Sequence, residues 1–103
     1  MQIEFSFLSS NKKTMIHGVK WVPETNVRAI LQLSHGMIEY IGRYRDFAEY
    51  LNRFGFLVVG NDHLGHGQSV TSPDEWGYFA EKDGGAFLVE DLHQVTELSL
   101  IHI

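Results

Sequence analysis

Two short, almost purely apolar segments with an amphipathic pattern between them are the feature that most limits the folds this sequence can adopt. Ala29–Leu33 is apolar except for Gln32, and Phe56–Val59 contains no polar residue. Runs of this kind are typical of strands buried on both faces, as in a parallel sheet covered by helices above and below. We therefore expect a parallel pair of strands. The segment between them must then contain the crossover connection that parallel strands require.

The intervening segment Gly42–Gly55 has the periodicity of a helix, with one apolar stripe and one polar face. The apolar stripe consists of Tyr44, Phe47, Ala48, Leu51 and Phe54, and the polar positions are Arg45, Asp46, Glu49, Asn52 and Arg53. Gly55 stands where a helix commonly ends. A strand, a helix and a strand in about thirty residues predict a βαβ unit, and its crossover is expected to be right-handed.

Further elements are predicted on either side of this unit. Residues 3–7 alternate apolar and polar side chains, which indicates a half-buried strand, and a second strand is expected over Met15–Val22, before Pro23. The polar stretch between them predicts an antiparallel hairpin. A last helix is expected from near Gly85, with an apolar face formed by Leu88, Leu92 and Val95. This order of elements predicts an α/β fold.

Composition excludes several classes of protein. A chain of 103 residues suffices for one small domain, and the lack of cysteine excludes disulfide scaffolds, thiolate metal sites and cysteine nucleophiles. Thirteen acidic against eight basic residues, a net charge of −5, argue against nucleic acid as the main partner. No apolar run approaches the ~20 residues of a membrane-spanning helix, and the N-terminus does not have the pattern of a signal peptide. We expect a cytoplasmic globular domain.

The first candidate site follows the strand Ala29–Leu33. Ser34-His35-Gly36-Met37 predicts a tight turn whose backbone N–H groups point into the space beyond the strand end. Open parallel sheets bind their ligands in that space. In the alternative interpretation, Gly36 only permits the turn and His35 only hydrogen-bonds to its neighbours.

The second candidate site is the polar loop after Phe56–Val59, expected over Gly60–Gly85. Its chemistry is concentrated in Asp62, His63, Gly65, His66, Gly67, Gln68 and Ser69. A metal site with Asp62, His63 and His66 as ligands is one interpretation. The spacing matches neither the His-x-His-x-Asp-His pattern of metallo-hydrolases nor His-Glu-x-x-His on a helix. We therefore favour a structural loop whose side chains bind local backbone, and we predict no metal or cofactor.

A third cluster, Gly42-Arg43-Tyr44, opens the predicted helix of the βαβ unit. A helix start can bind an anion. The interpretation we favour is that Arg43 is a local tether and that Tyr44 belongs to the core.

Taken together, these clusters resemble the α/β-hydrolase superfamily, in particular its branch of monoacylglycerol lipases, lysophospholipases and serine aminopeptidase-like hydrolases. The resemblance rests on Leu33–Met37, Gly42–Tyr44, Asp62–Ser69 and Glu90–Leu92, in their order and spacing. It implies a partial α/β-hydrolase domain over residues 4–97. It also implies a serine esterase that acts through a Ser-His-acid triad on lipid or small acyl esters.

The resemblance assigns the backbone N–H of Met37 to the oxyanion hole, with His35 and Gly36 supporting the turn. The family's Gly-x-Ser-x-Gly nucleophile elbow does not occur, because neither Ser34 nor Ser69 has glycines two residues away on both sides. We therefore expect an N-terminal fragment that lacks the triad, is inactive by itself and self-associates through an open strand edge. The alternative is a non-enzymatic α/β domain that binds a small ligand or a partner beyond the strand ends.

The last six residues, Leu98–Ile103, are expected to be a non-native tail. They end on β-branched residues, which are poor choices for closing a helix. They also resemble, residue for residue, one reading frame of the transposon end used to prepare sequencing libraries. The alternative is a natural helix end with a chance similarity.

Overall fold

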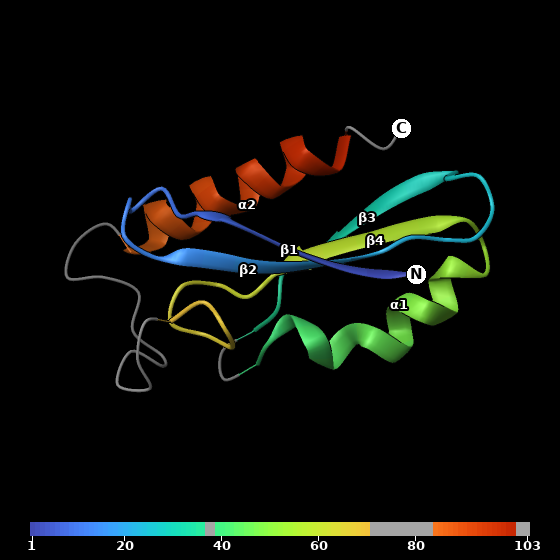
Figure 1. Ribbon diagram of the computed structural model, residues 1–103, viewed down its shortest axis with the longest axis horizontal. Coiled ribbons are helices and arrows are strands. Elements are labelled where there is room, and N and C mark those ends of the chain that lie inside the picture. Colours follow the sequence, from blue (N-terminus) through green and yellow to red (C-terminus); the bar gives the residue numbers. More distant parts are fainter. Residues whose placement is uncertain (37–38, 71–83, 101–103) are drawn as a thin grey trace.

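The computed structural model describes residues 1–36, 39–70 and 84–100, which form a four-stranded sheet with helices on both faces (Figure 1). The strands β1 (Gln2–Leu8), β2 (Met15–Trp21), β3 (Ala29–Leu33) and β4 (Phe56–Asn61) lie in the order β1-β2-β4-β3. The 3-10 helix η1 (Ile41–Tyr44) and helix α1 (Arg45–Asn52) cover one face, and helix α2 (Gly84–Leu100) covers the other. Within the described ranges, no helix combines the length and the apolar character needed to cross a membrane.

The first two strands form the predicted antiparallel hairpin. Ile3 lies opposite Lys20, and Phe7 lies opposite Ile16. In β1 every second side chain is half-buried and the others are exposed, as the alternation predicts. The turn is closed by Asn11, whose Oδ1 accepts hydrogen bonds from the N–H groups of residues 13 and 14 at 2.8 and 3.0 Å.

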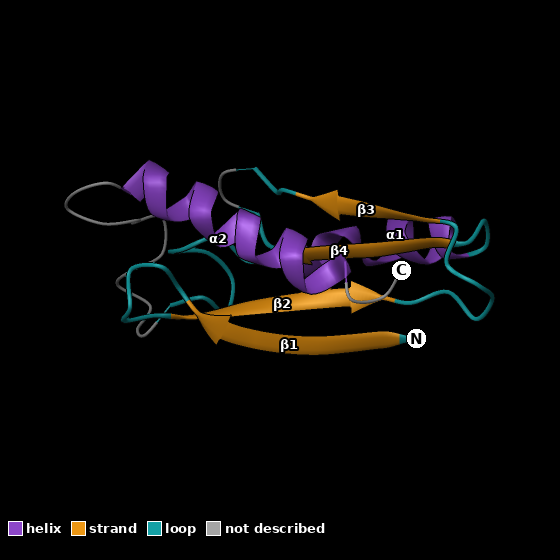
Figure 2. Cartoon of the chain, turned by 90° about the horizontal axis from the view of Figure 1, so that it is seen from above, coloured by secondary structure: helices purple, strands orange, loops and turns teal. Residues whose placement is uncertain are grey.

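The parallel pair is also confirmed. Ala29 lies opposite Phe56 and Leu33 opposite Gly60, with β3 and β4 running in the same direction. Figure 2 shows β4 inside the sheet and β3 at its edge. This position explains why the expectation that both strands are buried on both faces is wrong for β3. β4 is buried along nearly its whole length, whereas β3 is half-buried with Ala29 exposed, because only one of its two sides is paired in the described sheet.

The helix of the βαβ unit is shorter than predicted. It ends at Asn52, and Gly55 follows with a φ of 85°, a left-handed conformation that glycine adopts without steric cost. Ala48 is fully buried, with Tyr44 and Leu51 packed around the same core cluster. These residues follow the i, i+4, i+7 spacing of a single helical stripe.

Two residues of the predicted apolar stripe are about half exposed, Phe47 at 48% and Phe54 at 49%. Phe47 lies on the flank of the stripe, and Phe54 lies beyond the helix end. Asn52, expected in solvent, is instead half-buried, because its Nδ2 donates to the backbone oxygens of Trp21 and Phe56 at 3.0 and 2.7 Å. These two contacts join the end of α1 to β2 and β4.

Helix α2 covers the opposite face and packs on β4. Val95 joins Leu57 and Val59 in a buried cluster, which agrees with the predicted apolar face. The same face also buries a carboxylate that the pattern does not reveal. Asp91 accepts hydrogen bonds from Ser9 Oγ and from the N–H of Ser10, both at 2.7 Å, and so ties the β1–β2 turn to α2.

The predicted tail begins inside α2, which continues to Leu100 and buries Ser99. Residues 101–103 lie outside the described part of the chain. The non-native origin of residues 98–103 therefore stays a prediction.

Replacing Asp91 by alanine should destabilise the chain much more than replacing its exposed neighbour Glu90 by alanine. Asp91→Ala leaves two donors of the turn unpaired in a buried environment, at a cost of about 2 kcal/mol or more. Both changes introduce the same helix-favouring residue, so the difference isolates the contact. Urea denaturation followed by far-UV circular dichroism measures it, and equal midpoints for the two variants would contradict the proposed contribution.

Candidate functional site

Two polar segments meet at the carboxyl ends of β3 and β4. Because the strands are parallel and paired as far as Leu33 and Gly60, the turn of residues 34–36 begins beside the loop that follows β4. β4 extends to Asn61, two residues further than expected, so this loop begins at Asp62 and is described as far as residue 70. The arrangement places both predicted clusters at the sheet edge where α/β proteins bind ligands.

His35 and His63 join the two segments by reciprocal hydrogen bonds. The backbone N–H of His63 donates to His35 Nε2 at 3.0 Å, and His63 Nε2 lies 3.1 Å from the carbonyl oxygen of His35. His35 Nδ1 lies 2.7 Å from the carbonyl oxygen of Gly36. The rings of His35 and His63 are in contact, with their centroids 4.1 Å apart. A lateral connection of this kind fixes the turn relative to the loop.

The partners of these two rings determine which nitrogen carries the proton. A carbonyl oxygen only accepts, so His35 is protonated on Nδ1 and His63 on Nε2. His35 Nε2 must stay unprotonated to accept from the N–H of His63. His35 is therefore neutral. Burial lowers the pKa of His35 and lowers the pKa of His63 to about 4, so the neutral form of His63 follows from its burial.

Ser34 forms what looks like a nucleophile and base pair with His63. Its Oγ lies 3.0 Å from His63 Nε2. That nitrogen carries a proton for the carbonyl oxygen of His35, so it has no free lone pair to take the proton of Ser34. His63 Nδ1 is buried and has no hydrogen-bond partner among the described residues. Ser34 and His63 thus have the spacing of a catalytic pair without its proton-accepting chemistry.

His66 completes a cluster of three buried histidines. Its Nδ1 lies 3.0 Å from the carbonyl oxygen of Leu64, and its ring centroid lies 5.1 Å from that of His35. Among the residues that the structure describes, no group of three histidine or acidic side chains has the geometry to hold a metal ion. Asp62 and His66 contact backbone groups of their own loop, whereas His63 contacts the carbonyl oxygen of His35 on the other segment, so the role of the loop stays a prediction.

Asp62 is the most heavily connected side chain of the loop. Its side chain is only 3% exposed. Oδ1 accepts from the N–H of Ile41 at 2.7 Å, while Oδ2 accepts from the N–H of Gln68 at 3.0 Å and contacts His17 Nδ1 at 2.7 Å. Burial alone would raise the pKa of this carboxyl group, but the hydrogen bonds outweigh it and hold the pKa below 3.8.

The remaining loop residues shape the chain around Asp62. Gly65 and Gly67 have φ values of 74° and 49°, in the left-handed region. A Cβ atom on Gly67 would lie 2.4 Å from Asp62 Cγ, so only glycine fits there. Ser69 Oγ donates to the carbonyl oxygen of Asp62 at 2.7 Å and accepts from the N–H of His17 at 2.9 Å.

The turn after β3 has a partner that the sequence analysis did not identify. The N–H of Gly36 was expected to point into open space, but it donates to Glu39 Oε2 at 3.1 Å. The other oxygen of Glu39 accepts from the hydroxyl of Tyr44 at 2.7 Å, which lowers the pKa of Glu39, and lies 4.0 Å from the Arg43 guanidinium. Arg43 is therefore a local tether, as predicted. Met37 lies outside the described residues, so its role stays a prediction.

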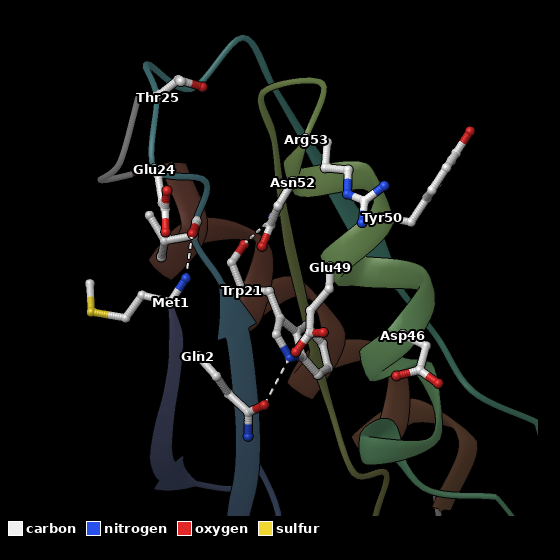
Figure 3. Close-up of a pocket in the computed structure, with 11 residues that line it drawn as sticks. Met1, Gln2, Trp21, Glu24, Thr25, Asp46, Glu49, Tyr50, Asn52 and Arg53 are labelled. Carbon is white, nitrogen blue, oxygen red and sulfur yellow. Dashed lines mark hydrogen bonds between the residues drawn. The ribbon is translucent and has the colours of Figure 1, made fainter.

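A cavity of about 610 Å³ lies elsewhere, at the end of the sheet where β3 and β4 begin (Figure 3). Its lining includes Trp21, Glu49 and Asn52. None of the predicted site residues lines it. The candidate site is therefore the pair of joined segments at the opposite end of the strands.

Parallel strands between two helical layers, with polar loops at the strands' carboxyl ends, place this chain in the α/β class. The family model described as serine aminopeptidase, S33 (Hydrolase_4) matches residues 25–100. The chain belongs to this family, which groups it with serine hydrolases of the esterase and lipase type.

Individual relatives agree with this family assignment. The chain is 32% identical over 83 residues to a monoglyceride lipase of Homo sapiens, a match covering 81% of this chain and 23% of the relative. It is 38% identical over 66 residues to a monoacylglycerol lipase of Mycolicibacterium smegmatis, covering 64% and 23%. The structure of a carboxyl esterase from Bacillus coagulans superposes with a TM-score of 0.85 at 32% identity, covering 95% of this chain and 31% of that one. The chain thus spans less than a third of the length of each of these relatives.

Replacing Gly67 by alanine should destabilise the chain by about 1–3 kcal/mol, because the new Cβ would overlap the Asp62 carboxylate and occupy a left-handed backbone position. Gly85→Ala is the matched control, since a Cβ there meets nothing within 4 Å and alanine favours the helix. Thermal unfolding of both variants measures the difference. A Gly67→Ala variant as stable as Gly85→Ala would show that the loop does not close around Asp62.

Proposed function

We propose that this chain forms the N-terminal part of a serine hydrolase that cleaves carboxylic esters of lipid or small acyl substrates. The family membership and the monoglyceride lipase relatives support this substrate class. The observation that carries the proposal most directly is the reciprocal bonding of His35 and His63. It fixes the turn after β3 at the edge where a substrate carbonyl would lie.

In this proposal the backbone N–H of Met37, next after the anchored Gly36, donates to the oxyanion of the transition state. A preorganised backbone donor stabilises the negative charge that develops on the carbonyl oxygen, and losing one such donor typically costs ~3 kcal/mol. The serine, the base and the acid of the triad are not assigned to any residue of this sequence. The nucleotide sequence downstream of codon 97 tests the proposal. An in-frame Gly-x-Ser-x-Gly after one further strand supports it, and a stop codon there would favour a non-enzymatic binding domain.

The chain of 103 residues should not hydrolyse short-chain nitrophenyl esters, nor should a fluorophosphonate probe label it. Ser34 Oγ lies 3.0 Å from His63 Nε2, and the proton on that nitrogen prevents His63 from activating the hydroxyl group. Initial rates above the buffer blank, and mass spectrometry after incubation with the probe, provide the measurement. Turnover that disappears in Ser34→Ala, but persists in a Ser10→Ala control, would overturn the prediction.

In a longer hydrolase that carries this sequence, Met37→Pro should lower kcat far more than Met37→Ala. Proline removes the N–H that the oxyanion needs, whereas alanine retains it and removes only the side chain. The expected difference is about 100-fold or more in kcat, measured with a soluble ester substrate. Equal losses in the two variants would mean that Met37 acts through its side chain.

A further inference from the structure

A buried carboxylate holds the candidate site together, and its charge has to be balanced. Asp62 bridges the loop that carries Gln68 and the segment that begins at Ile41, through backbone N–H groups at 3.0 and 2.7 Å. A carboxylate with a 3% exposed side chain is costly to bury unless a positive partner compensates it. The two neutral histidines of the site, His35 and His63, supply none.

His17 on β2 is placed to supply this charge. Its Nδ1 lies 2.7 Å from Asp62 Oδ2, and its Nε2 lies 2.8 Å from Glu4 Oε1 on β1. Two carboxylate oxygens can each only accept a hydrogen bond, so both ring nitrogens must carry protons. The geometry therefore requires the imidazolium form.

The two partners of His17 differ in their exposure to solvent. The Asp62 side chain is almost fully buried, whereas Glu4 is 60% exposed and faces an open pocket of about 380 Å³ that His17 and Gln68 help to line. The contact with Asp62 is shielded from solvent, and the contact with Glu4 is not. We expect Asp62 to be the stronger partner, in agreement with its hydrogen bond being the main cause of the raised pKa of His17.

We propose that His17 is a positioning residue: as an imidazolium it holds the Asp62 carboxylate, and through it holds residues 62–70 and the start of η1 in the geometry of the candidate site. The site's use in hydrolysis rests on the proposed function, but the proposed contact does not. Within the part of the chain that the structure describes, the titratable groups around this pair are Glu4 on β1, His35 on the turn after β3, and His63 and His66 on the loop.

The contact predicts a definite pH dependence. The pKa of His17 is raised above 6.5 in the folded chain, so the stabilisation is complete below pH 6.5 and is lost as the pH rises through the folded-state pKa. The pKa of Asp62 lies below 3.8 in the folded chain. The stabilisation from the Asp62 carboxylate is therefore lost only as the pH falls through that folded-state pKa. The loop should therefore loosen selectively on the alkaline side.

Hydrogen exchange of the whole chain at low micromolar concentration tests this. Mass spectrometry follows backbone amides of residues 62–70 between pH 5.5 and 9, corrected for intrinsic exchange rates, with β4 as the internal reference. Exchange of the imidazole C2 proton gives the pKa of His17 in the same samples. Protection of the loop relative to β4 should fall by about tenfold as His17 deprotonates, the order of magnitude of losing a hydrogen bond to a charged group.

Two variants separate charge from shape. His17→Asn keeps a neutral donor near the position of Nδ1, so loop protection should persist and lose its alkaline dependence. Glu4→Gln keeps the Asp62 contact, so the dependence should remain with its midpoint at lower pH. The proposal is overturned if the wild-type loop is unprotected at every pH, if its protection does not change with pH, or if His17→Asn retains the same profile. None of these readouts requires hydrolysis, so they are independent of the proposed function.

Discussion

The polar end of this sheet depends on the burial of one carboxylate, that of Asp62. Its oxygens take hydrogen bonds from the segment before α1, from its own loop and from β2, and a glycine at position 67 leaves the room it needs. Removing the charge would leave backbone N–H groups unpaired, and removing the space would displace the loop. Because a buried anion is stable only when fully bonded, these contacts form as a unit rather than one by one.

The fold could be predicted because its main signals are local. An alternation of period two identifies β1, short apolar runs identify β3 and β4, and a stripe of period 3.6 identifies α1. The errors arose where environment overrides pattern. Phe47 fits the apolar stripe but lies on its flank, and Asn52 looks like a surface residue but caps two strand carbonyls.

The site could be predicted only in part, for the same reason. The glycines and histidines of the loop are concentrated in a few positions and are visible in the sequence. The partner that completes the site lies on another element, since His17 is 45 residues away from Asp62. The contact that ties the hairpin turn to α2 is equally hidden, since Ser9 is 82 residues away from Asp91. Neither residue stands out locally, because in a half-buried hairpin a histidine or serine fits the polar positions. Such pairs follow from the packing of β2 and α2, which no local pattern encodes.

The histidines at this end of the sheet do different chemistry because their partners differ. His35 is neutral because its ring donates to a carbonyl oxygen and accepts from a backbone N–H, and burial keeps His63 neutral. His17 lies between two carboxylates, which require a charged ring. Their effects on stability oppose each other. With its pKa lowered to about 4, His63 disfavours folding as the pH falls below 6.5, and with its pKa raised, His17 withdraws stabilisation as the pH rises above that value. In the folded chain His63 stays neutral down to about pH 4 and His17 stays charged to above pH 6.5, so both networks are intact together between these limits, where one ring is neutral and the other is charged.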